Sequence, residues 1–353
     1  LHKEYRRQRQ MCIRDRSVTA RNISITDAAR LFAENAHRIA VIGHVNPDAD
    51  AIGSGLAVVH AAHLLGKEAW LSFAYPDETP ETLRILPGAD TIVRPCDMPD
   101  DIDFVVVVDC GSADRMGVLH HLAEKVPYTL IIDHHRSNDG FGTHSVIVPR
   151  ADATAQLILD FLDALGVALT PSIASCLFAG LLTDTGGFHW GSARAHADAA
   201  RLVEVGIDAD SLTRQLMDTR PFSYLELLGT VLQTATLLPD AGKGRGLVYA
   251  TVPHDVYKNA RPEDVQALID VVRTTGEAEV ALVMREMTSG VWTGSLRSRS
   301  LVNVADIARH FGGGGHRQAA GFTVTSSLND VLHTILRILD NPPLHDGYRA
   351  LTP

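Results

Sequence analysis

Apolar and polar stretches alternate along the chain in a way that predicts an α/β fold. Short apolar runs typical of buried strands occupy 39–42, 69–74, 104–108 and 128–132. Helical periodicity fills the stretches around them, over 26–37, 50–66, 153–165 and 172–182. The run over 104–108 is apolar at every position, as expected of a strand covered on both faces. This pattern predicts a mostly parallel sheet flanked by helices.

A second, smaller α/β pattern follows the Gly/Lys/Arg cluster at 239–246, which is typical of a linker or turn. It consists of a strand over 247–252, a helix over 262–274, a hairpin over 279–299, a strand over 322–325 and a helix over 328–339. We therefore predict a first domain over 21–210, a helical linker over 211–245 and a second domain over 246–345. Residues 1–20 are interpreted as a non-native or disordered leader, and a basic targeting or nucleic-acid arm is the alternative.

Length, cysteine content and net charge limit the classes of function that are compatible with the sequence. The 353 residues are enough for two separate cores. The four cysteines show no CxxC spacing, which fits a reducing cytoplasm. A net charge of -10 argues against a long basic groove for nucleic acid but leaves a small phosphorylated substrate open. No apolar run is long enough to span a bilayer, so we expect no membrane partner, and a homodimer is left open.

Acidic and imidazole side chains gather where predicted elements end. In open α/β sheets, sites form at the carboxyl ends of the strands. The strand over 39–42 is followed by His44, Asp48 and Asp50, and the strand over 104–108 by Asp109. The remaining candidates are Asp133, His134 and His135 after the strand over 128–132, and Asp184 just beyond a buried helix.

Each of these positions also has a purely structural explanation. Asp50 or Asp184 could cap a helix, and His134 or His135 could be a satisfied core histidine. A purely structural explanation is less satisfactory for all four predicted strand and helix ends together. Neighbouring carboxylates repel one another unless a cation lies between them. Histidine and aspartate suit Mn²⁺, Fe²⁺ or Zn²⁺, and the set is large enough for two ions with one bridging carboxylate.

These motifs resemble a known family. His44 to Ser54, Val108-Asp109, Asp133-His134-His135 and Thr183-Asp184-Thr185-Gly186 are similar to the four motifs of the DHH phosphoesterase superfamily. Residues 313–321 resemble the signature of its DHHA1 domain. The resemblance covers about residues 22–340 and is greatest to the nanoRNase/phosphoadenosine phosphatase group, the NrnA-like proteins. It implies a DHH catalytic domain and a DHHA1 substrate-binding domain across a cleft.

The resemblance also implies roles for the clustered residues. One Mn²⁺ would be held by His44, Asp48 and Asp109. The other would be held by Asp50, Asp109, His134 and Asp184, with Asp109 as the bridge. His135 would face the scissile phosphate, and Asp133 would orient it from behind. Mg²⁺ or another divalent cation is the alternative to Mn²⁺.

The second domain offers groups suited to an anion. Backbone N–H groups of a glycine run can form a nest around an anion, and Arg297 and Arg299 alternate on a predicted strand so that both share a face. A flexible loop and a solvated strand are the plain alternatives. The resemblance assigns binding of the uncut part of the substrate to Gly313, Gly314, Gly315 and His316, with Arg297 assisting.

The implied activity is Mn²⁺-dependent hydrolysis of very short RNA to nucleoside monophosphates, together with dephosphorylation of 3′-phosphoadenosine 5′-phosphate. A linear or cyclic dinucleotide phosphodiesterase and a RecJ-like single-strand exonuclease are the enzymatic alternatives. The non-enzymatic alternative is a nucleotide-sensing module without catalysis. We would expect such a module to lack some of the metal ligands, whereas the set in this chain is complete.

Overall fold

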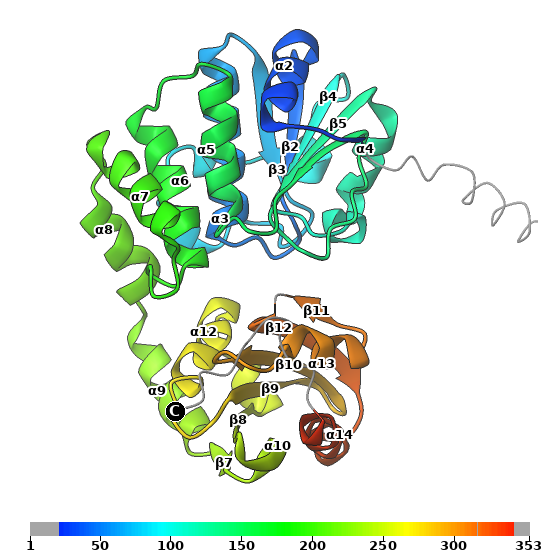
Figure 1. Cartoon of the computed structure of the whole chain (residues 1–353), viewed down its shortest axis with the longest axis vertical. Helices are drawn as coiled ribbons and strands as arrows, with labels where there is room; N and C mark the ends of the chain where they lie inside the picture. The colour runs from blue at the N-terminus through cyan, green and yellow to red at the C-terminus, as the bar shows by residue number, and fades with distance from the viewer. Residues whose placement is uncertain (1–20, 316, 342–353) are drawn as a thin grey trace, which may run out of the picture. The chain divides into compact units, whose positions relative to one another are not determined.

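The computed structural model describes residues 21–315 and 317–341. The expectations for 1–20, for His316 and for 342–345 lie outside these residues. The chain divides between Thr219 and Arg220 into two compact units, each with its own sheet and helices (Figure 1).

The first unit is built on a six-stranded sheet in which every neighbouring pair is parallel. In order across the sheet, its strands are β1 (Arg21–Asn22), β6 (His144–Ile147), β5 (Tyr128–Asp133), β4 (Phe104–Val108), β2 (Arg38–Ile42) and β3 (Glu68–Ser72). The prediction of a mostly parallel sheet is confirmed. The sequence pattern missed β1 and β6, which are short and carry polar residues that interrupt the apolar signal.

Helices α2 (Ile25–Asn35), α3 (Ala49–Leu64) and α5 (Thr154–Ala164) pack on one face of this sheet. Helix α6 (Pro171–Asp184) packs against α3 and α5, and α7 (Ala193–Glu204) and α8 (Ala209–Thr213) pack against α6. The π-helical turn η5 (Arg214–Asp218) follows α8. Short helical elements lie in the connections between the strands, and η4 packs on the opposite face of the sheet. They are η1 (Glu81–Leu83), η2 (Ala89–Thr91), η3 (Pro95–Asp97), η4 (Ala113–Leu119) and α4 (His120–Lys125). Figure 1 shows α5 and α6 beside each other in this helical layer.

The two sheet faces account for the continuous apolar run of β4. Val106 and Val108 pack into the core beneath the helical layer, whereas Val105 and Val107 pack on the opposite face against Met116 of η4. All of these side chains are fully buried. Burying a side chain of this size stabilises the fold by roughly 1.5–3 kcal/mol, so β4 anchors the centre of the unit.

The second unit holds a mixed six-stranded sheet in the order β11-β12-β10-β9-β8-β7, in which only β8 and β9 pair in parallel. The strands are β7 (Thr236–Leu238), β8 (Leu247–Val252), β9 (Val280–Thr288), β10 (Val291–Ser298), β11 (Gly314–Gly315) and β12 (Ala319–Thr325). The helices are α9 (Phe222–Leu232), α10 (Ala241–Gly244), α11 (His254–Tyr257), α12 (Pro262–Val272), α13 (Val304–His310) and α14 (Leu328–Asp340).

Separate cores lie on the two faces of this sheet, one with α9 and α12 and the other with α13 and α14. The stretch over 211–245, expected to be helical, contains α9 but then forms β7, which pairs with β8.

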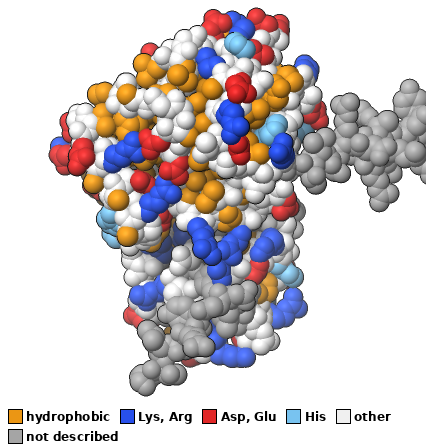
Figure 2. Space-filling model, turned by 45° about the horizontal axis from the view of Figure 1, so that its top comes forward, with side chains coloured by type: hydrophobic (Ala, Val, Ile, Leu, Met, Phe, Trp, Pro, Cys, Tyr) orange, Lys and Arg blue, Asp and Glu red, His pale blue; other side chains and the backbone are white. Residues whose placement is uncertain are grey.

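The helices and the surface charge of the described residues bear on which partners the protein can bind. Within 21–315 and 317–341, no helix combines the length and apolarity needed to cross a bilayer. On the face drawn in Figure 2, acidic and basic side chains are interspersed with apolar ones over the first unit, so the surface charge there is mixed.

Candidate metal centre and anion site

The candidate ligands converge because their strands are neighbours. Strands β5, β4 and β2 lie side by side and parallel, so their carboxyl ends meet at one edge of the sheet. This edge carries His44 after β2, Asp109 after β4, and Asp133 at the end of β5, followed by His134 and His135. Helix α3 adds Asp48 and Asp50 at its start, and α6 adds Asp184 as its last residue. The structure thus brings all eight predicted residues together.

Asp109 lies at the centre of the cluster. Its Oδ2 is 3.5 Å from His44 Nε2, whereas its Oδ1 is 3.5 Å from His134 Nε2 and 3.6 Å from His135 Nδ1. Its backbone adopts φ 53°, a left-handed conformation that is costly for an aspartate and that is found most often at functional sites. The two carboxylate oxygens therefore face two different groups of potential ligands.

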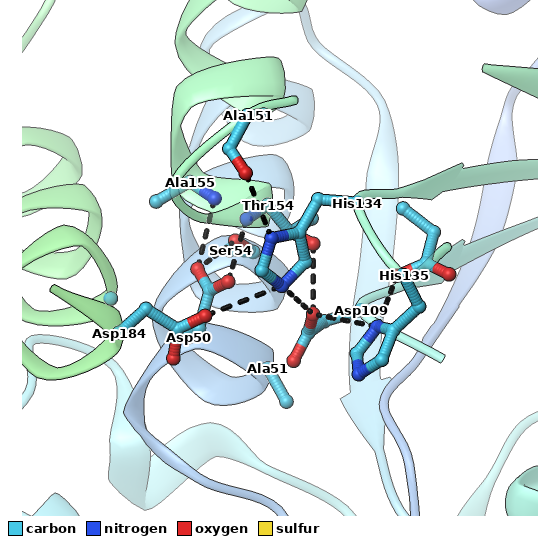
Figure 3. Close-up of polar contacts among 12 residues, drawn as sticks. Asp50, Ala51, Ser54, Asp109, His134, His135, Ala151, Thr154, Ala155 and Asp184 are labelled. Carbon is cyan, nitrogen blue, oxygen red and sulfur yellow. Dashed lines mark hydrogen bonds and ion pairs between the residues drawn. The ribbon is translucent and has the colours of Figure 1, made fainter. Parts of the chain in front are cut away.

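The imidazoles of His44 and His134 are oriented through their second ring nitrogen. His44 Nδ1 lies 2.8 Å from the carbonyl of Val45, and His134 Nδ1 lies 3.2 Å from the carbonyl of Ala151. In both rings Nε2 then points at the carboxylates, and Figure 3 shows His134 between Asp109 and Asp184. Ligand histidines in metal sites are usually held in this way.

Asp50 caps a helix, but not the helix that contains it. Helix α3 is capped by Asp48, whose side chain accepts from the N–H groups of Asp50 and Ala51. Asp50 is fully buried and accepts from the N–H groups of Thr154 (2.6 Å) and Ala155 (2.9 Å), the first residues of α5. Helix α5 lacks a capping side chain of its own. The carboxylate of Asp50 is thus fixed by two elements.

Asp184 closes α6, whereas the sequence pattern expected it just beyond that helix. Its Oδ2 lies 3.3 Å from His134 Nε2. The carboxyl end of a helix carries partial negative charge, so an aspartate there is unfavourable unless a cation or a donor compensates it.

His135 forms a separate chain of contacts. Its Nδ1 is 2.7 Å from Oδ1 of the fully buried Asp133, and Asp133 Oδ2 accepts from Asn138 Nδ2 at 2.7 Å. Asn138 also donates to the carbonyl of Cys110, which lies next to Asp109. This arrangement fixes the ring of His135 with Nε2 as the nitrogen opposite Asp133.

Without a cation, protons compensate the crowded carboxylates. Burial opposes protonation of His44, but hydrogen bonds to Asp109 and Asp48 raise its pKa to about 10. Burial also opposes protonation of His134, yet Asp184 and Asp109 raise its pKa to about 11. Burial, with the charge of Asp48, raises the pKa of Asp184 to about 6. Such a site exchanges protons for cations when metal binds.

The donor set fits divalent cations. Three groups have ligand atoms within 4.8 Å of one another: His44, Asp48 and Asp109; Asp50, His134 and Asp184; and Asp109, His134 and His135. Imidazole together with carboxylate suits Mn²⁺, Zn²⁺ or Fe²⁺. Because Asp109 and His134 each belong to two groups, the sets are contiguous.

Sequence reasoning missed the residues that hold this cluster in place. Thr154, fully buried, donates its hydroxyl to Asp109 Oδ1 at 2.8 Å while its N–H binds Asp50. Arg115 is half-buried, with Nη2 2.9 Å from His44 Nδ1. Asn138 was also missed. Threonine and asparagine carry no spacing signal, and only the tertiary fold brings these residues to the site.

In the second unit, two guanidiniums share one face of the sheet, although not the predicted pair. Arg299 lies beyond the end of β10, and its guanidinium donates to the carbonyl of Gly276. Arg285 on β9 takes its place, because the strand register puts Arg285, Ser295 and Arg297 on the same face. Arg285 Nη2 donates to Ser295 Oγ at 3.2 Å, and its Nε is buried with no hydrogen-bond partner among residues 21–315 and 317–341.

Burial lowers the pKa of Arg285 and of Arg297. Neither forms an ion pair with a carboxylate in the part of the chain that the structure describes. Two partly buried cations without a paired anion fit a site for an anionic group, which supports the role predicted for Arg297 without testing it.

The glycine run is built differently from the expected nest. Gly314 and Gly315 form strand β11 against β12, and the N–H of Gly313 donates to the carbonyl of Ala308 at 2.9 Å. A Cβ on Gly313 would lie 2.2 Å from the carbonyl oxygen of Gly321, so this position requires glycine for packing. Gly313 therefore does not offer its N–H to an anion in this structure, and the substrate roles of Gly314, Gly315 and His316 stay predictions.

Family comparisons agree with this architecture. The model of the DHH family, N-terminal domain, matches residues 38–181, and the model of the DHHA1 domain matches residues 244–341. The chain is 34% identical over 317 residues to the bifunctional oligoribonuclease and PAP phosphatase NrnA of Thermus thermophilus, an alignment that covers 88% of this chain and 91% of that protein.

Solved structures show the same fold. The crystal structure of an exopolyphosphatase-related protein from Bacteroides fragilis matches with a TM-score of 0.81 and 22% identity, over 90% of this chain and 96% of that one. RecJ of Thermus thermophilus in complex with Mn²⁺ matches with a TM-score of 0.52 and 15% identity, over 91% of this chain and 55% of RecJ.

Proposed function

Since the chain belongs to the DHH family and carries a DHHA1 domain, we propose that it is a Mn²⁺-dependent two-metal phosphohydrolase acting on very short RNA. The observation that carries the proposal is the buried cluster around Asp109, whose two oxygens face different ligand groups. A structural role alone would not require so many adjacent carboxylates in a buried site.

Residues on the two sides of Asp109 would hold separate ions. His44 and Asp48 lie on one side, and His134, Asp50 and Asp184 on the other. When bound, the cations lower the pKa of a nucleophilic water and neutralise charge on the phosphoryl oxygens. Thr154 and the amino terminus of α5 keep Asp109 and Asp50 in position.

His135 acts on the substrate in this proposal. Asp133 accepts from Nδ1, so Nε2 is the nitrogen that faces the scissile phosphate. There the ring stabilises charge on the phosphoryl group or passes a proton to the leaving oxygen. In the second unit, Arg285 and Arg297 bind an anionic part of the substrate that is not cut.

The proposed substrates follow the Thermus relative, whose name states oligoribonuclease and PAP phosphatase activity. Short RNA and 3′-phosphoadenosine 5′-phosphate each offer a scissile phosphate beside a second anionic or nucleoside group. The net charge of -10 disfavours a long strand. Three described cysteines are free, which fits the cytoplasmic setting that we propose.

A substrate panel with Mn²⁺ tests the proposal. We expect fast cleavage of a ribodinucleotide, slower cleavage as chains lengthen, and release of phosphate from 3′-phosphoadenosine 5′-phosphate. Equal rates on a dinucleotide and on long single-stranded DNA would favour a RecJ-like exonuclease. Preference for a cyclic dinucleotide would favour the phosphodiesterase alternative, and no hydrolysis of any substrate would leave only the nucleotide-sensing alternative.

A further inference from the structure

The turn that follows Asp184 has an unusual backbone. Gly186, Gly187 and Phe188 are consecutive residues with φ values of 57°, 69° and 66°, so all three lie in the left-handed region. Phenylalanine rarely adopts this conformation, because its side chain crowds the backbone there. Strained residues of this kind persist where the surrounding structure requires them, most often at functional sites.

The aromatic side chains in and just after this turn differ in exposure to solvent. Phe188 turns inward, with its ring centroid 6.1 Å from that of Phe178 and 5.5 Å from that of His196. The next two residues, His189 and Trp190, are exposed, and Trp190 keeps 51% of its surface in solvent. Tryptophan combines a large apolar ring with one polar N–H, which suits it to positions that are partly exposed.

Trp190 forms a hydrogen bond with the backbone of a candidate metal ligand. Its indole Nε1–H donates to the main-chain carbonyl of Asp184 at 2.8 Å, and the Asp184 carboxylate lies 3.3 Å from His134. The indole also lies over Gly186, where a Cβ would be 2.2 Å from the ring. The ring is therefore held in place against the backbone of Asp184, a residue of the candidate metal centre.

We propose that the exposed part of the Trp190 indole stacks on a nucleobase of the substrate whose phosphate binds at the centre. This inference rests on the proposed function. Aromatic rings stack on any base because every base has a π-face, so such a contact selects nucleotides without reading their sequence. Trp190 loses little freedom on binding, because its hydrogen bond and its packing on Gly186 already hold it.

Trp190 could instead act only on Asp184, by fixing the turn that carries this ligand. The two roles differ in what they need from the substrate. Support of Asp184 would affect every substrate and would change metal binding. Stacking would affect only substrates that carry the base in question, and it would leave metal binding unchanged.

Kinetics with abasic substrates separate the two roles. Trp190→Leu removes the aromatic face, and Trp190→Phe keeps it without the N–H. The substrates are diadenylate and its two singly abasic analogues, assayed with Mn²⁺. We expect Trp190→Leu to raise KM for diadenylate about tenfold. Trp190→Phe should raise it less, because it keeps the aromatic face and loses only the N–H that donates to Asp184.

One abasic analogue should show no further loss with Trp190→Leu, because it already lacks the stacked base. Mn²⁺ affinity should be equal in all three proteins. Equal losses on all substrates, a reduced Mn²⁺ affinity, or no loss on diadenylate would each overturn the proposal.

Fluorescence offers a second, independent readout. The sequence has three tryptophans, so the variant Trp70→Phe/Trp292→Phe reports on Trp190 alone. We expect adenosine 5′-monophosphate to quench its emission in a saturable way, and ribose 5-phosphate, which has the same phosphate but no base, to leave it unchanged. Equal effects of the two ligands, or no effect of either, would contradict stacking.

The two proposals can fail separately. If wild-type protein hydrolyses diadenylate while Trp190→Leu behaves as wild type, stacking is wrong and the proposed function stands. If wild-type protein hydrolyses neither diadenylate nor the analogues, the proposed function is wrong, and stacking as we state it is wrong with it.

Discussion

The two units gather buried charge of opposite sign. In the first unit, Asp50, Asp109 and Asp133 are buried with two histidines at the end of a parallel sheet. In the second, Arg285 and Arg297 are partly buried on one face of a mixed sheet. Buried charge without a counter-charge is costly, so one arrangement fits a cation and the other an anion.

The difference shows how each site depends on its sheet. Parallel strands bring residues distant in sequence to one edge, so the carboxylates belong to several separate motifs. An antiparallel hairpin instead puts residues of adjacent strands on a common face, so the arginines come from one local segment. Substitutions in the first site should therefore affect chemistry, and those in the second should affect substrate binding.

The largest effect is expected at Asp109. Asp109→Ala removes ligand oxygens from both sides of the cluster, so hydrolysis should be abolished, well beyond the about 10–100-fold loss typical of supporting residues. Steady-state assays with Mn²⁺ measure this, and circular dichroism checks that the fold persists. Near-normal turnover in a folded variant would rule out the bridging role.

Metal binding should depend strongly on pH. At pH 7 the cation-free centre holds protons on His44 and His134, whose pKa values are raised to about 10 and about 11 by the surrounding carboxylates. Ligand nitrogens must lose these protons, so apparent Mn²⁺ affinity should rise with pH by roughly tenfold per unit for each proton released. Calorimetry between pH 6 and 8 in buffers of different ionisation enthalpy measures the release. A pH-independent affinity would contradict this picture.

Thr154 should matter through its hydroxyl. Thr154→Val keeps the shape of this fully buried side chain but removes the donor to Asp109, and we expect an about 10–100-fold loss of metal affinity or turnover. Thr154→Ser keeps the donor and serves as the matched control, with activity close to wild type. If the two variants behave alike, packing rather than the hydrogen bond explains the position.

The arginines of the second unit should show a smaller effect, confined to substrate binding. Arg297→Ala and Arg285→Ala should each raise KM by about tenfold, since a hydrogen bond to a charged group is worth roughly 1.5–3 kcal/mol, and Mn²⁺ content should not change. Arg299→Ala is the control, because its guanidinium binds the carbonyl of Gly276. Loss of bound metal in the Arg297 or Arg285 variant would contradict the division of roles between the two units.

Features carried by strong local patterns could be predicted from the sequence. The central strand β4 is apolar throughout because helices and short turns cover both of its faces, and that made Asp109 recognisable as a strand-end residue. Strand β6 was not predicted, because two of its four residues, His144 and Ser145, are polar and interrupt the apolar run.

The supporting contacts could not be predicted, because they join elements far apart in the chain. Asp50 caps α5 from a distance of 104 residues in sequence, and Thr154 contacts Asp109 across 45. The packing role of Gly313 could not be predicted for a related reason. A run of glycines indicates backbone freedom, but only the structure shows that Gly313 uses it for close packing against β12.

The central claim is that the Asp109 cluster holds two divalent cations with Asp109 between them. Equilibrium dialysis against Mn²⁺, with metal counted per chain, tests it most directly. We predict two ions in wild-type protein, one in Asp50→Ala, which leaves His44, Asp48 and Asp109 in place, and one or none in Asp109→Ala. A single ion in wild-type protein, or the same count in all three proteins, would contradict the claim.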